Sequence, residues 1–185
     1  MKTMMGLMMG LVLAAEMVWG APPVAQTPAQ VAAKAEAVKI LANADNDKAA
    51  EALVATIKRM ISDKTGQAVK DGMPELTVAA LVKIDLKRAL IILPRMFNSI
   101  IGVVRLDMFQ RLVASAVLAS GSSSAVVVQA ILTGLGNQER WVSAVKTVAQ
   151  DIAAPLPGAL QQAILTISPT ILPPAVIPPG TYEGQ

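Results

Sequence analysis

The stretch TPAQVAAKAEAVKIL, residues 27–41, contains two independent signals of an α-helix. It opens with Thr27, Pro28 and Gln30, and a threonine cap, a proline in the first turn and a glutamine three residues after the cap are typical of a helix start. Its apolar residues Val31, Ala35, Val38 and Leu41 then recur every three or four positions, which places them on one face of a helix. We therefore predict a helix with one buried face, ending near Ala42.

The same pattern recurs along the chain, interrupted by turns that contain Gly, Asn, Asp, Ser or Pro. Asp85 and Asp107 are predicted helix caps, and Pro94 is expected to kink or break its helix because it lacks a backbone donor. The stretch Phe97–Leu106 is apolar without a clear period, and we expect it to be helical. The further predicted helices cover residues 47–64, 74–82, 86–93, 108–119, 124–133, 141–152 and 160–167.

No stretch alternates long enough to predict a strand, so the expected fold class is all-α, with about six to eight helices. Helix starts at Asp47, Asp85, Ser122 and near Pro155 recur at intervals of roughly 35 residues, which suits a short α-solenoid of helical hairpins. A small helical bundle with short turns gives the same spacing. We favour the bundle.

Residues 1–20 have the three parts of a cleavable signal peptide. Lys2 supplies the positive start, Met4–Ala15 is apolar, and small residues precede an expected cut after Gly20. Glu16 ends the apolar run well short of the roughly 20 residues that a membrane-spanning helix needs. The expected location is therefore periplasmic or extracellular, after cleavage.

The expected organisation beyond the signal is a short arm at 21–26, one helical domain at 27–167 and a proline-rich tail at 168–185. The tail prolines forbid a helix and favour an extended, polyproline-like conformation. The tail is also apolar, so we expect it to lie on its own domain or, as the less favoured alternative, to dock on a partner. The expected contact residues are Ile171, Leu172, Pro173, Pro174, Val176, Ile177, Pro178 and Pro179.

The chain has no histidine and no cysteine. It therefore lacks the usual general base, the Ser-His and Cys-His nucleophile pairs and the usual zinc ligands. The Ser143 and Lys146 spacing and the Lys64-Thr65-Gly66 triplet resemble elements of penicillin-recognising enzymes, but they occur in reversed order in too short a chain. No catalytic, cofactor or metal site is expected.

The formal net charge is +3, and the basic residues alternate with acidic ones instead of forming a stripe. A nucleic-acid partner is therefore not expected. The longest uncharged stretch, Leu112–Gln138, is expected to form the buried centre of the domain, with membrane association or a lined apolar cavity as the less favoured alternatives. The expected function is that of an exported non-enzymatic protein acting by protein contact. A carrier of a lipid or other apolar ligand is the alternative, and a membrane-associated helical protein is the second alternative.

Overall fold

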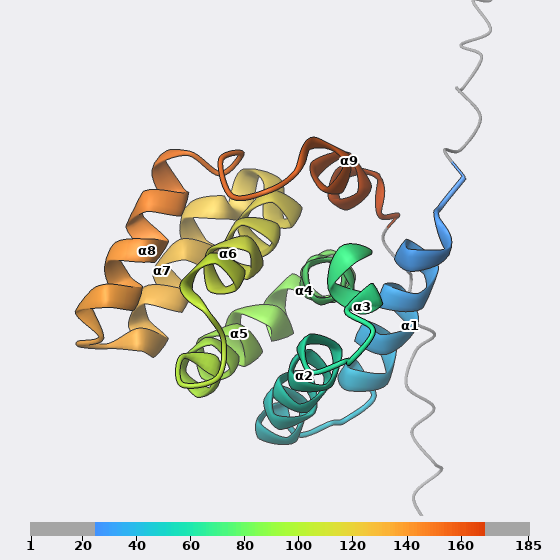
Figure 1. Cartoon of the computed structure of the whole chain (residues 1–185). Coiled ribbons are helices and arrows are strands. Elements are labelled where there is room, and N and C mark those ends of the chain that lie inside the picture. The colour runs from blue at the N-terminus through green and yellow to red at the C-terminus, as the bar shows by residue number, and fades with distance from the viewer. Residues whose placement is uncertain (1–24, 169–185) are drawn as a thin grey trace, which may run out of the picture.

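The computed structural model describes residues 25–168, and within this range the chain is helical without a strand, as predicted (Figure 1). The predicted signal peptide and almost all of the predicted tail lie outside the described residues. The elements are α1 (Pro28–Leu41), α2 (Asn46–Ile61), α3 (Gln67–Lys70), α4 (Met73–Ile84), α5 (Leu86–Ile100), α6 (Leu106–Ser120), the 3₁₀ turn η1 (Gly121–Ser123), α7 (Ser124–Leu135), α8 (Glu139–Gln150) and α9 (Gly158–Thr166).

Helix α4 forms the centre of the molecule. Every residue from Pro74 to Val82 is buried, so α4 has no solvent-facing side over this length. A helix that is buried all round must be covered from several directions. Its main neighbours are α1 and α6, which are far apart in the sequence, and α2, α3, α5 and α9 complete its surroundings. The fold is therefore a helical bundle around α4.

Two of the predicted helix caps are confirmed. The Thr27 hydroxyl accepts a hydrogen bond from the backbone N–H of Gln30 at 3.2 Å, and the Gln30 side-chain oxygen accepts from the backbone N–H of Thr27 at 2.6 Å. The Asp85 carboxylate accepts from the backbone N–H of Arg88 at 3.0 Å and caps α5. The prediction for Asp107 was wrong, because this residue lies in the first turn of α6, where its carboxylate contacts Arg105 at 3.2 Å.

The predicted kink or break at Pro94 does not end α5, which continues to Ile100. Proline removes one backbone hydrogen bond from a helix and clashes with the preceding turn. Beyond it, however, Met96, Phe97 and Ile100 continue the buried face that Ile92 and its neighbours begin. Burying these large side chains offsets the lost hydrogen bond, so α5 includes residues 97–100 of the stretch Phe97–Leu106. The helix expected over this stretch was wrong for residues 101–105, which form the turn before α6.

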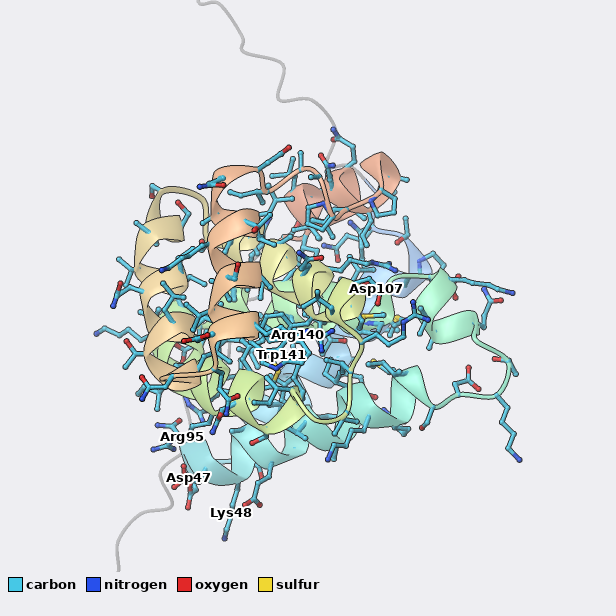
Figure 2. The ribbon with its side chains drawn as sticks, turned by 60° about the vertical axis from the view of Figure 1, so that its left-hand side comes forward. Asp47, Lys48, Arg95, Asp107, Arg140 and Trp141 are labelled. Atoms are coloured by element: carbon cyan, nitrogen blue, oxygen red, sulfur yellow. The ribbon has the colours of Figure 1, made fainter. Side chains whose placement is uncertain are left out.

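Three aromatic rings tie α5, α6 and α8 together. Phe97 and Phe109 meet edge to face with ring centroids 5.3 Å apart, and Phe109 and Trp141 lie 4.7 Å apart. The Arg140 guanidinium lies 5.4 Å from the Trp141 ring centroid, and Figure 2 shows these two residues side by side on α8. Each such aromatic pair adds about 0.5–1.5 kcal/mol to the burial of its rings.

Helix α9 is attached by a buried glutamine of α1. The side chain of Gln30 is 2% exposed, and its Nε2 donates to the Ala163 carbonyl at 2.6 Å and to the Thr166 hydroxyl at 2.8 Å. Leu160 packs over Gly72, whose φ of 68° lies in the left-handed region. Gln30 thus caps α1 and holds the last described helix against it. The buried side of α1 is formed by Gln30, Ala33, Ala37, Ile40 and Leu41, so the predicted buried face was right for Leu41 and wrong for Val31 and Ala35, which are exposed.

Candidate functional site

The uncharged stretch Leu112–Gln138, which we expected in the interior, forms parts of two helices that differ in burial. In α6 every residue from Leu112 to Val117 is buried. In α7 the buried residues are limited to Val127, Ile131 and Leu135, which recur every four positions along one side. The expectation of a buried centre is therefore confirmed for α6 and wrong for the outer side of α7.

An overlapping segment, Leu106–Leu135, is long and apolar enough to meet the length and composition criteria for a membrane span. Leu106–Leu135 contains a window with a mean hydropathy of 1.6, of which 22% is buried. Gly121, at a φ of 55°, ends α6, and η1 separates it from α7. The segment thus comprises helices of 15 and 12 residues, each shorter than the roughly 20 residues needed to cross a bilayer.

The outer side of α7 and one residue of α5 line an open groove of about 460 Å³, which we call the α5/α7 groove. Its walls are mainly apolar, and Val126 is 54% exposed to solvent. No lining residue is ionisable. The lining residues are Leu90, Ala125, Val126, Gln129, Ala130 and Thr133.

Two polar side chains on α7 lie along this groove. The Thr133 hydroxyl is directed to its own helix, where it donates to the Gln129 carbonyl at 2.9 Å. The Gln129 side chain is exposed and carries both an amide donor and an acceptor. The groove therefore offers apolar contact along its length and an amide group at Gln129.

A close contact between backbones sets the spacing of the two helices beside the groove. A Cβ added at Gly134 would lie 2.5 Å from the Pro94 carbonyl oxygen and 2.6 Å from its Cα. Only glycine permits this approach of α7 to α5. Leu90 and Ala130 lie about one helical turn before this contact on their respective helices, where the groove opens.

The second candidate is a buried ion pair between α4 and α6. The Glu75 side chain is 0% exposed, and its Oε1 lies 2.7 Å from a terminal nitrogen of the Arg111 guanidinium. Burial raises the pKa of the Glu75 carboxyl above its usual range, and the Arg111 charge opposes that rise. The two groups are complementary in charge, so we assign them a structural role in joining the two helices.

A cavity of about 200 Å³ lies on the Arg111 side of this pair. Its lining is mainly apolar and comes from α1, α4, α9 and the residues before them, and Lys70 and Asp71 also line it. Among residues 25–168, no group of three or more Asp, Glu, His or Cys side chains is placed to hold a metal ion.

The contact residues predicted from the sequence, Ile171, Leu172, Pro173, Pro174, Val176, Ile177, Pro178 and Pro179, lie outside the described residues. The sequence reasoning missed the groove because it treated α7 as buried on all sides. Gln129 and Thr133, four positions apart, were the available signal, since polar residues at this spacing mark an exposed side of a helix. The exposed Val126 lies three positions before Gln129.

Comparison with protein-family models, curated proteins and solved structures finds no significant match.

Proposed function

We propose that this chain is an exported, non-enzymatic protein that acts by protein contact in the cell envelope or outside the cell, with the α5/α7 groove as its contact site. The observation that carries the proposal is an apolar groove without an ionisable lining residue, bordered by a valine that is 54% exposed. Exposed apolar grooves on folded domains are typical of binding sites.

The groove chemistry favours an uncharged, apolar segment of a partner protein. A charged segment would lose its hydration against these walls without gaining a counter-ion, which is unfavourable. Gln129 is suited to pair with a backbone amide or carbonyl of an extended segment. The lack of histidine and cysteine in the whole sequence supports a role in contact instead of catalysis.

A photo-crosslinking amino acid at Thr133, which lines the groove and whose hydroxyl bonds to its own helix, tests this contact in the producing cell. We expect a discrete protein adduct, and Val126→Asp should reduce its yield at least tenfold because a carboxylate in the apolar groove is costly to desolvate. Val126 occupies the first turn of α7, where an acidic residue is compatible with the helix, so the domain should remain folded.

Val31→Asp is the matched control, because Val31 is also 54% exposed and lies in the first turns of α1. It should leave the adduct unchanged. An adduct that persists in Val126→Asp, or the absence of any protein adduct, contradicts contact through the groove. Adducts made only with lipid would instead support the carrier alternative.

Export is tested by the N-terminus of the protein recovered from the envelope or the medium. We expect the mature chain to begin at Ala21, because small residues precede this position after a short apolar run. Mass spectrometry of the N-terminal peptide measures the cut directly. Leu11→Arg should block export, because a charge interrupts the apolar run, and the uncut precursor should accumulate. Recovery of an exported chain that still begins at Met1 contradicts the proposal.

A further inference from the structure

Arg111 takes part in the buried ion pair and also lines the cavity beside it, which we call the α1/α4/α9 cavity. Glu75 is 0% exposed, whereas the Arg111 side chain is 24% exposed, so the accessible side of the pair belongs to the guanidinium. An arginine side chain carries five N–H donors in a planar fork, more than one carboxylate oxygen at 2.7 Å can use. The Arg111 Nε has no hydrogen-bond partner among the described residues. Arg111 therefore has donors left for a second carboxylate.

The charged residues of this cavity favour an anionic occupant. Lys70 and Asp71 line it together with Arg111, whereas Glu75 lies behind Arg111 and is not among the lining residues. The Asp71 carboxylate already accepts a hydrogen bond from the Gln67 side chain at 2.7 Å. Lys70 and Arg111 are both positively charged donors without acceptor capacity. An occupant with a negatively charged group that only accepts hydrogen bonds is therefore the best match.

The helices α1, α4 and α9 all begin at this cavity and add to its positive potential. The first N–H groups of a helix have no partner within the helix, and they give its start a partial positive charge. In the part of the chain that the structure describes, no side chain caps α4 or α9, so their first N–H groups keep this charge. The helix starts line the cavity through Thr27 and Ala29 of α1, Gly72 of α4, and Pro157 and Ala159 of α9.

The remaining wall of the cavity suits a short apolar chain. It includes Leu76 and Leu160 and the methyl groups of Ala159 and Ala163. An apolar cavity of about 150 Å³ holds one benzene ring, so a cavity of about 200 Å³ has room for about eight non-hydrogen atoms. A second charged group on the occupant would lose its hydration against this wall. The occupant should therefore be short, singly charged at one end and apolar at the other.

We propose that the α1/α4/α9 cavity binds a small aliphatic monocarboxylate, whose carboxylate accepts hydrogen bonds from Arg111 and whose alkyl chain lies against Leu76 and Leu160. Hydrogen bonds between a guanidinium and a carboxylate are about twice as strong as neutral ones, so the head group provides the selectivity for charge. Burial of the alkyl chain provides the remaining affinity. The cavity shares no lining residue with the α5/α7 groove, so this binding is independent of the proposed protein contact.

An NMR titration of the nitrogen-labelled full chain with hexanoate tests the proposal, because hexanoate has one charge and about eight non-hydrogen atoms. We expect saturable binding that shifts the backbone amide signals of Gly72 and Ala159. Hexanamide keeps the chain but has no charge, and acetate keeps the charge but has almost no chain. Each should bind at least about tenfold more weakly than hexanoate. No saturable binding of hexanoate, or equal binding of hexanamide or of hexylammonium, overturns the proposal.

Ala159→Leu locates the binding in this cavity. Ala159 is exposed in the first turn of α9 and lines the cavity, and leucine is compatible with a helix, so the larger side chain should fill the cavity in a folded chain. The affinity for hexanoate should fall at least about tenfold. Ala35→Leu is the matched control, because Ala35 is exposed on α1 and is not among the lining residues. An unchanged affinity in Ala159→Leu, or an equal loss in both variants, overturns the proposal.

Lys70→Gln distinguishes Arg111 from Lys70 as the residue that holds the carboxylate. Replacing Arg111 itself would also leave the buried Glu75 without its partner, whereas Lys70 is exposed and its replacement should leave the fold intact. The affinity for hexanoate should fall by less than about threefold, because an exposed charge contributes little, and the preference over hexanamide should remain. Loss of that preference in Lys70→Gln overturns the assignment of the carboxylate to Arg111.

Discussion

Gly134→Ala should lower the free energy of unfolding by about 2–3 kcal/mol, since overpacking a close contact typically costs about 1–3 kcal/mol. The added methyl group would lie 2.5 Å from the Pro94 carbonyl oxygen and 2.6 Å from the Pro94 Cα. Both are backbone atoms of α5, so no side chain can rotate away to make room. Relief requires α7 to move away from α5, which separates the buried surfaces on either side of the contact.

Urea unfolding followed by circular dichroism measures this effect, and Gly102→Ala is the matched control. A Cβ added at Gly102 meets nothing within 4 Å, and its φ lies outside the left-handed region. The control should be within about 0.5 kcal/mol of the unsubstituted chain, because replacing glycine there mainly restricts the unfolded chain. A Gly134→Ala variant as stable as Gly102→Ala would show that the two helices are not held at this separation.

The sequence predicted those features of the fold that depend on local chemistry. Thr27 and Gln30 are three residues apart, so their reciprocal hydrogen bonds can be anticipated without knowing the rest of the molecule. The same holds for Asp85, which caps the helix that follows it. The four-residue helix α3 was missed, because one helical turn is too short to show a period.

Features that depend on contacts between distant residues were not predictable in this way. The role of Gly134 follows from the position of Pro94 on another helix. The uncharged character of α7 is compatible with either a buried or an exposed helix, and the number of neighbours decides between them. Here α6 has helices on several sides, whereas α7 contacts α5, α6 and α8 and keeps one side exposed. The groove is the result of that unequal covering.

Glu75 shows the same limit for charged residues. Its position in the first turn of α4 is favourable for a carboxylate and suggests a solvated residue at a helix start. In the fold it is 0% exposed, because α1, α6 and α9 cover α4, and Arg111 of α6 supplies the opposite charge. The pair joins residues of two helices that only the tertiary structure brings together.

Arg111→Met should therefore destabilise the fold more than Gly134→Ala does, by about 3–5 kcal/mol at neutral pH, the usual cost of leaving a buried charge without its partner. Methionine preserves much of the arginine stem and its packing but removes the counter-ion of Glu75. Arg105→Met is the control, since Arg105 is 89% exposed beside Asp107, and an exposed ion pair contributes little to stability. Equal effects of the two arginine substitutions would show that the buried pair does not join α4 and α6.

The pH dependence of the Arg111→Met variant identifies Glu75 as the cause. Burial already raises the pKa of this carboxyl in the folded chain, and removing the Arg111 charge raises it further. As pH rises, the unfolded chain releases the Glu75 proton before the folded chain does. Between the pKa of Glu75 in the unfolded chain and its higher pKa in the folded chain, the folded state therefore binds more protons, and its stability falls with increasing pH. The destabilisation should thus be small near pH 4 and grow toward pH 8. Adding Glu75→Gln to Arg111→Met should remove this pH dependence, because the glutamine amide does not ionise. A double variant with the same pH profile as Arg111→Met would rule out Glu75 as the source of the dependence.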